Sequence, residues 1–110
     1  MKKLVRINCE DFSTPDVVSV EWEGEGDDEL GLVQALSDTF VAMSGEKRSD
    51  GHGRLVNPYF SRAWCPTLKR SLSSPTVEEL CKALADGEKT FVLGDEYDCG
   101  MFHETILAIV

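Results

Sequence analysis

Hydrophobic and polar residues alternate in two segments near the start of the chain, and this pattern predicts two half-buried strands. In the segment 3–9, one face carries Val5, Ile7 and Cys9, and the other carries Leu4, Arg6 and Asn8. In the segment 17–23, one face carries Val18, Val20 and Trp22, and the other carries Ser19, Glu21 and Glu23. A loop marked by Pro15 separates the segments, so the two strands could pair antiparallel.

Two further segments have the spacing of helices. After a turn at 24–28, a helix is predicted over about 29–44, which Asp27 or Asp28 can cap and Gly45 ends. Its core-facing stripe comprises Leu32 or Val33, Leu36, Phe40 and Met43. A second helix begins within 74–79, where either Ser74 with Pro75 or the pair Thr76 and Glu79 can form its N-terminal cap. The apolar stripe of this helix comprises Val77, Leu80, Cys81 and Leu84, and Gly87 ends it.

The last part of the chain contains two more predicted strands, at 90–93 and 102–110, joined by an acidic turn. The second ends in the apolar run 106–110, which favours a central place in a sheet. The order strand, strand, helix, irregular segment, helix, strand, strand predicts an α+β fold. We expect a mainly antiparallel sheet of about four strands, with two helices packed on one face.

The 110 residues amount to one domain, 1–110, and the segment from about 46 to 73 is its least regular part. This segment has no clear period and holds six basic against two acidic residues, a local charge of +4. So long a connection without structure is uncommon in a compact domain, so it is a functional loop, a disordered insert or a set of short elements.

The formal net charge of the whole chain is −9, which argues against direct binding to nucleic acid or to an anionic membrane. It favours association with a basic protein, although acidity can equally serve solubility. The longest uninterrupted apolar run, 106–110, is far shorter than a membrane span of ~20 residues, and no secretory signal is visible. We therefore expect a cytoplasmic protein whose four cysteines are free thiols.

The most distinctive feature is a cluster of six acidic residues within nine positions. They are Glu21, Glu23, Glu25, Asp27, Asp28 and Glu29. A second acidic group occupies the turn with Asp95, Glu96 and Asp98, and the two would form one negative surface if both turns lay at one end of the sheet. The alternative is a solvated face without a partner. Three aromatic residues of the middle segment, Tyr59, Phe60 and Trp64, either anchor an interface or pack into the core.

Catalytic and metal-binding signatures are weak. Cys65 or Cys99 with His52 or His103 could form a nucleophile and base, but no family signature surrounds them. Asp95, Cys99 and His103 are spaced four apart, yet no Cys-x-x-Cys pair supplies further zinc ligands. Neither Gly24-Glu25-Gly26 nor Gly51-His52-Gly53 is a phosphate-binding loop. We therefore expect no cofactor, no metal and no catalytic residue.

These observations favour a small acidic inhibitor or immunity protein that neutralises a basic, nuclease-like toxin by covering its active site. The predicted contact residues are the six acids and the three aromatic residues. A phage-encoded inhibitor of a host defence complex, a small enzyme that uses a cysteine and a histidine, and a structural subunit that oligomerises through its apolar C-terminal strand are the alternatives.

Overall fold

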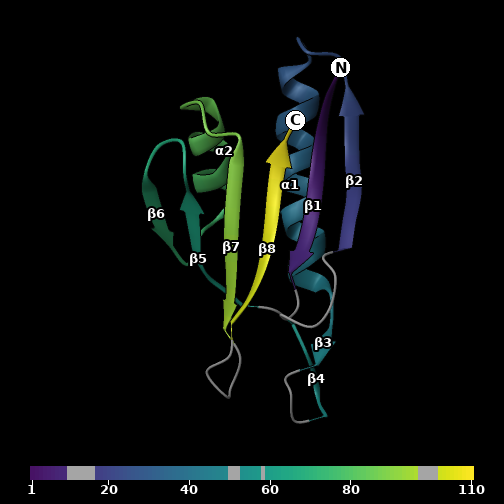
Figure 1. The fold of residues 1–110 in the computed structure, drawn as a ribbon, viewed down its shortest axis with the longest axis vertical. Helices are drawn as coiled ribbons and strands as arrows, with labels where there is room; N and C mark the ends of the chain where they lie inside the picture. The colour runs from purple at the N-terminus through teal and green to yellow at the C-terminus, as the bar shows by residue number, and fades with distance from the viewer. Residues whose placement is uncertain (10–16, 50–52, 58, 97–101) are drawn as a thin grey trace.

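A computed structural model describes residues 1–9, 17–49, 53–57, 59–96 and 102–110. Its elements, in chain order, are β1 (Lys2–Cys9), β2 (Val17–Gly24), α1 (Glu29–Gly45), β3 (Arg48–Ser49), β4 (Leu55–Val56), β5 (Phe60–Cys65), β6 (Arg70–Ser73), α2 (Val77–Ala85), β7 (Thr90–Glu96) and β8 (Phe102–Ile109) (Figure 1). The fold is α+β with two helices and an antiparallel sheet, as the sequence predicts.

The main sheet has six strands in the order β2-β1-β8-β7-β5-β6, and every neighbouring pair is antiparallel. The prediction of about four strands was therefore too low. The two extra strands, β5 and β6, come from the segment 46–73, which also holds the separate two-stranded pair β3-β4. The sequence left three alternatives for this segment, and the structure shows the last of them, a set of short elements.

Two shifts in strand register explain why the alternation of apolar and polar residues predicted some strand faces wrongly. The register shifts between Phe60 and Arg62, so Phe60 and Ala63 are both buried although they are three residues apart. A second shift puts Trp22 opposite Leu4 but Val20 opposite Val5. Neighbouring residues of β1 point to opposite faces, so Trp22 lies on the core side and Val20 on the other side. The predicted common face of Val18, Val20 and Trp22 was wrong.

Both helices begin at side-chain caps. Asp28 caps α1, because its Oδ1 accepts a hydrogen bond from the backbone N–H of Gly31 at 3.0 Å. Thr76 caps α2 in the predicted capping box with Glu79. The chain leaves α2 through Gly87, whose φ of +108° lies in the region that favours glycine.

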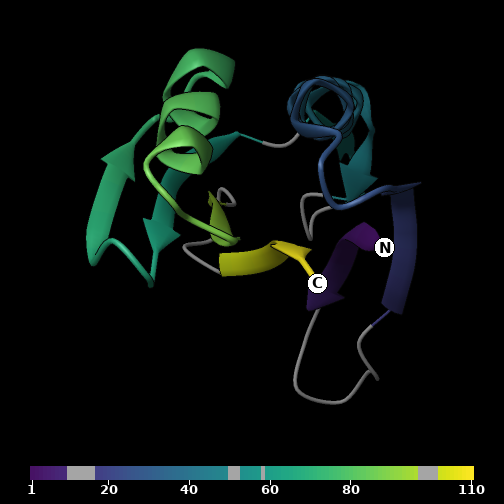
Figure 2. The same ribbon diagram turned by 90° about the horizontal axis from the view of Figure 1, so that it is seen from above.

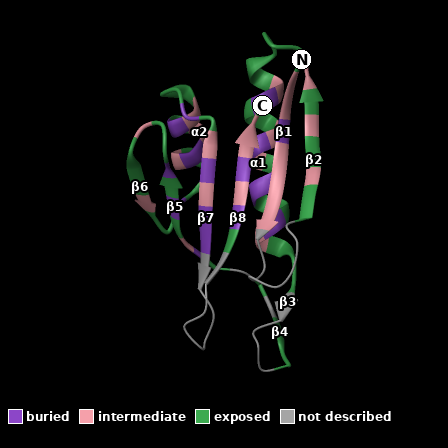
Figure 3. Cartoon of the chain, in the orientation of Figure 1, coloured by how far each residue is buried: buried purple, intermediate pink, exposed green. Residues whose placement is uncertain are grey.

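The core lies between the helices and one face of the sheet. Figure 2 shows both helices on the concave side of the curved sheet, and the buried positions of the strands alternate with less buried ones (Figure 3). The sheet buries Leu4, Ala63, Phe91, Leu93 and Leu107, and the helices bury Leu32, Leu36, Phe40, Met43, Leu80 and Ala83. The predicted stripe of α1 is confirmed with Leu32 in it, whereas Val33 is 37% exposed. Neither helix of the described chain is long and apolar enough to cross a membrane.

Candidate functional site

The acidic cluster occupies the end of β2, the following turn and the first residue of α1. All six side chains are exposed. We call Glu23, Glu25, Asp27, Asp28 and Glu29 the acidic end. Backbone hydrogen bonds from Asp28 to Glu25 and from Glu29 to Asp27 hold this turn in shape, so its carboxylates are carried by an ordered segment.

Glu21 and Glu23 do not share a face, contrary to the sequence prediction. Glu23 lies opposite Lys3 and forms an ion pair with it at 3.8 Å. Glu21 accepts a hydrogen bond from the hydroxyl of Ser19 at 2.8 Å, and Ser19 lies opposite Arg6 on the other face. The cause is the register shift next to Val20, which turns Glu21 towards the helix side of the sheet.

The two acidic groups of the sequence lie at opposite ends of the sheet. The acidic end follows Gly24, which lies opposite Lys2 near the start of β1. Asp95 and Glu96 end β7 at its far end, opposite His103 and Phe102, while Thr90 begins β7 opposite Ala108 near the C-terminus. The two acidic turns therefore do not lie at one end of the sheet, as one combined negative surface would require. Asp98 lies outside the described residues.

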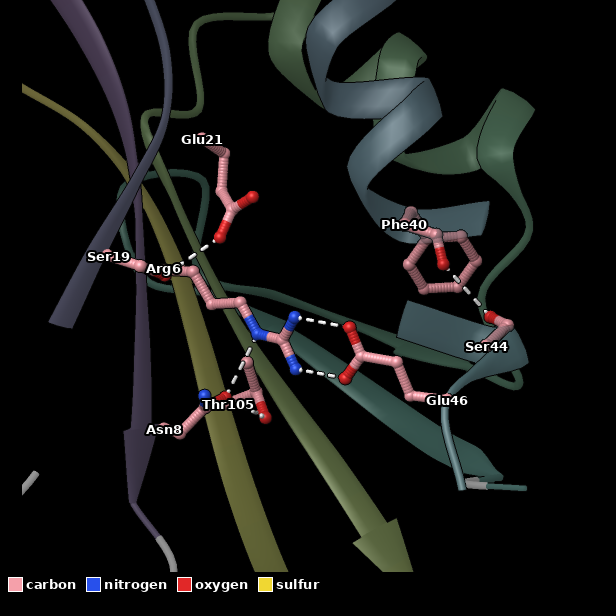
Figure 4. Close-up of polar contacts among 8 residues, drawn as sticks. All are labelled: Arg6, Asn8, Ser19, Glu21, Phe40, Ser44, Glu46 and Thr105. Atoms are coloured by element: carbon pink, nitrogen blue, oxygen red, sulfur yellow. Dashed lines mark hydrogen bonds and ion pairs between the residues drawn. The ribbon is translucent and has the colours of Figure 1, made fainter. Parts of the chain in front are cut away.

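Arg6 lies near Glu21 and contacts the residue that follows the far end of α1 (Figure 4). Its guanidinium donates two hydrogen bonds to the carboxylate of Glu46, at 2.8 and 2.6 Å, and one to the side-chain oxygen of Asn8 at 3.0 Å. The hydrogen bond with Glu46 is the main reason that the pKa of Arg6 is raised, and the charge of Glu21 contributes. Glu21 therefore acts on Arg6 through its charge and is bonded to Ser19, and we do not count it in the acidic end.

The remaining acids differ in what their carboxylates contact. Asp28 serves as the cap of α1, and Glu23 pairs with Lys3. Within the described residues, no hydrogen bond or ion pair engages the side chains of Glu25, Asp27 and Glu29. These three carboxylates are available to a partner without loss of an internal contact.

An open pocket of about 240 Å³ lies beside the acidic end, between the two helices and the end of the sheet. Its apolar lining includes Leu32 and Val33 of α1, Leu84 of α2, and Ile109 and Val110. Its charged lining residues are Lys2, Glu29, Glu88 and Lys89. Sequence reasoning missed this pocket because its walls come from four parts of the chain that no local pattern connects.

Glu88 is fully buried at the edge of this pocket. Its carboxylate accepts hydrogen bonds from the backbone N–H groups of Thr67, Leu68, Lys89 and Thr90. These bonds satisfy a buried charge and hold the turn between β5 and β6 against the start of β7. Glu88 is thus a structural group rather than a free ligand of the pocket.

The three aromatic residues of the middle segment have different environments. Phe60 is buried in the core, with its ring centroid 5.7 Å from that of Phe40, so of the two roles predicted for it the structure shows packing into the core. Tyr59 and Trp64 are 59% and 43% exposed. The Tyr59 hydroxyl shares a hydrogen bond of 2.6 Å with that of Ser74. β5, which carries Trp64, is separated from β2 by three strands, so the aromatic residues and the acidic end are not one surface.

Cys65, the candidate nucleophile that the structure describes, is poorly suited to nucleophilic attack, and so is Cys81. Burial is the main cause that raises the pKa of the Cys65 thiol, and the charge of Glu88 raises it further. Burial raises the pKa of Cys81 as well. The side chains of Cys9 and His103, and the whole of His52 and Cys99, lie outside the described residues. Among the residues that are described, no group of three metal-ligating side chains converges.

Comparisons of the chain with protein-family models, curated proteins and solved structures find no match.

Proposed function

We propose that the protein binds a basic protein partner through the acidic end, and that it acts as an inhibitor or immunity protein. The partner in this proposal is a nuclease-like toxin or effector whose basic, phosphate-binding active site is covered by the carboxylates. The observation that carries the proposal is the position of Glu25, Asp27 and Glu29, three exposed carboxylates on an ordered turn and helix start that have no partner among the described residues.

Electrostatics favours this surface over the rest of the molecule. The chain carries a net charge of −9, and the acidic end concentrates five carboxylates in seven residues. At physiological salt, charges act over a screening length of ~8 Å, so neighbouring carboxylates of this segment add to one local potential. Such a potential speeds the encounter with a basic surface and aligns it for docking.

The pocket beside the acidic end supplies the apolar contact that charge alone lacks. Tight interfaces rely on a few side chains that enter a water-excluded pocket. The floor formed by Leu32, Leu84 and Ile109 offers this apolar contact to a side chain of the partner, and the charged side chains of Lys2, Glu29 and Lys89 surround it.

The experiment uses the tagged protein as bait in lysate of its own source, at low and high salt, with the retained proteins identified by mass spectrometry. The test variant is E25K/D27K, and the matched control is D38K/E78K, which makes the same change in charge at exposed sites on α1 and α2. We expect the wild type and the control to retain a basic protein at low salt, and E25K/D27K to lose it. The retained protein is then assayed for nuclease activity with and without the chain.

Two outcomes would contradict the proposal. The first is equal retention by E25K/D27K and D38K/E78K, which would show that only the total charge matters. The second is a retained basic protein whose activity is unchanged when the chain is added in excess, which would leave binding without inhibition.

A further inference from the structure

The side of the sheet that faces away from the helices carries a continuous apolar surface. The cross-strand register places Val18 beside Ile7, Ile7 beside Ile106, Ile106 beside Val92, and Val92 beside Trp64. This row crosses five of the six strands, from β2 to β5. Val5 and Val20 begin a second row next to it. We call this surface the open face.

The open face is exposed in the described part of the molecule. Val18 is 61%, Val20 50% and Trp64 43% exposed, and Ile7, Val92 and Ile106 are half-buried. Their strand neighbours on the other face, such as Leu4, Phe91 and Leu107, are completely buried beneath the helices. Figures 1 and 2 show that both helices lie on that other side. An antiparallel sheet with one solvated face normally alternates apolar with polar residues, and this one does not.

The size of the open face matches that of a stable interface. With strands ~4.8 Å apart and a rise of ~3.3 Å per residue, the six strands present a flat area of roughly 650 Å². A standard protein–protein interface buries about 800 Å² of accessible surface on each partner. The apolar row from Val18 to Trp64 crosses the middle of this area, and contiguous exposed apolar patches are a mark of interaction sites.

The charges on the open face identify the kind of partner. Its described charged side chains balance: Lys3 pairs with Glu23 near one corner, and Arg62 and Glu104 line the same hollow near another. In a chain with a net charge of −9, the described charged side chains of this face therefore sum to zero. Two copies repel each other through their acidic surfaces but not through this one. A basic partner is drawn instead to the acidic end.

We propose that a second copy of this chain packs on the open face and forms a symmetric dimer with helix, sheet, sheet and helix layers. Face-to-face packing of two twisted sheets at about 10 Å buries the side chains of both inner faces. A two-fold axis makes each copy supply the same patch, so the balanced charges of one copy meet balanced charges of the other.

The test is the molar mass of the full chain in solution, measured by light scattering and by sedimentation at about 100 µM, where a micromolar Kd gives mainly dimer. The wild type is expected at twice 12.2 kDa. V18K/V20K places charges in the apolar patch and is expected to weaken the dimer at least tenfold. The control L30K/V41K makes the same chemical change at exposed positions of α1 and should leave the dimer intact.

A third variant distinguishes packing between faces from pairing between the edges of β2 strands. Trp64→Thr keeps a residue that favours strands but removes the largest apolar side chain of the open face, on a strand separated from β2 by three others. We expect it to weaken the dimer, with an unchanged circular dichroism spectrum. E25K/D27K should dimerise as the wild type does, so the dimer and the partner-binding proposal can fail separately.

The inference is overturned if the wild type is monomeric at this concentration. It is equally overturned if V18K/V20K abolishes the dimer while Trp64→Thr does not, because the copies would then pair along the β2 edge. A dimer that dissociates in high salt would also contradict it, since apolar packing is strengthened rather than weakened by salt.

Discussion

Arg6 and Glu46 join the middle of β1 to the residue that follows α1 by a two-pronged ion pair with distances of 2.8 and 2.6 Å. The Arg6 side chain is only 11% exposed and that of Glu46 is 43% exposed. Because 40 residues separate the two in sequence, the pair fixes the C-terminal end of α1 to the sheet. This contact sets where the long helix lies over β1.

We expect Glu46→Gln to lower the free energy of unfolding by about 1–2 kcal/mol, because the largely buried guanidinium of Arg6 loses its charged partner. The control is Asp86→Asn, which removes an ion pair with Arg70 in which both side chains are nearly half exposed. That change should cost no more than about 0.5 kcal/mol. Urea denaturation of the two variants checks the difference, and equal losses would show that the Arg6 pair is no stronger than a surface pair.

Glu88 should make the stability depend on pH in a defined range. Burial, the largest influence, would raise the pKa of Glu88, but the hydrogen bonds from Thr67, Leu68, Lys89 and Thr90 outweigh it and hold the pKa below its ordinary value of 4.5. A lowered folded-state pKa means that the unfolded chain binds the proton more readily. The stabilisation is therefore complete above about pH 4.5 and is lost as the pH falls through the folded-state value.

Glu88→Gln should remove this dependence and destabilise the protein at neutral pH by about 1–3 kcal/mol, because a neutral amide cannot replace a carboxylate facing four N–H groups. Thermal melts between pH 3 and 7 provide the measurement. Glu25→Gln, in the exposed turn, is the control and should change stability by less than about 0.5 kcal/mol. Parallel stability curves for Glu88→Gln and the wild type below pH 4.5 would show that Glu88 does not carry the dependence.

The local patterns of the sequence predicted the helices and four of the six main strands, because caps and stripes act over a few residues. The capping box of Thr76 and Glu79 and the stripe from Leu32 to Met43 are examples. β5 was missed because the register shift after Phe60 breaks the alternation on which strand prediction depends.

The candidate site was less predictable than the fold. The sequence shows the six acidic residues as a cluster, but the shift in strand register beside Val20 places Glu21 and Glu23 on different faces. The distance between the two acidic turns depends on strand order, which single-sequence patterns do not encode. The pocket and the open face arise from long-range pairing alone, as the row from Val18 to Trp64 illustrates.

Trp22 covers Gly24, so the residue at position 24 must lack a side chain. A Cβ atom there would lie 2.1 Å from Cζ2 of the Trp22 ring. We expect Gly24→Ala to displace this ring from the margin of the core and to cost about 1–3 kcal/mol. Gly26→Ala is the matched control, because a Cβ atom at that position meets no atom within 4 Å.

Tryptophan fluorescence reports this displacement directly. Trp64→Phe leaves Trp22 as the single tryptophan, so a change in emission wavelength can be assigned to its ring. In this background, Gly24→Ala should shift the emission towards the red as the ring gains solvent, and Gly26→Ala should not. Unchanged emission together with unchanged stability would mean that the ring moves aside without cost.

Cys65 and Cys81 should react slowly with thiol reagents in the folded protein, since burial raises the pKa of both and lowers the thiolate fraction at neutral pH. The test uses the variant C9S/C99S, which retains only these two thiols. With Ellman's reagent at pH 7, labelling should be slow in buffer and become rapid in denaturant. Rapid labelling of folded protein at pH 6–7, abolished by Cys65→Ser, would instead reveal an activated thiol and favour an enzyme that uses Cys65 as its nucleophile.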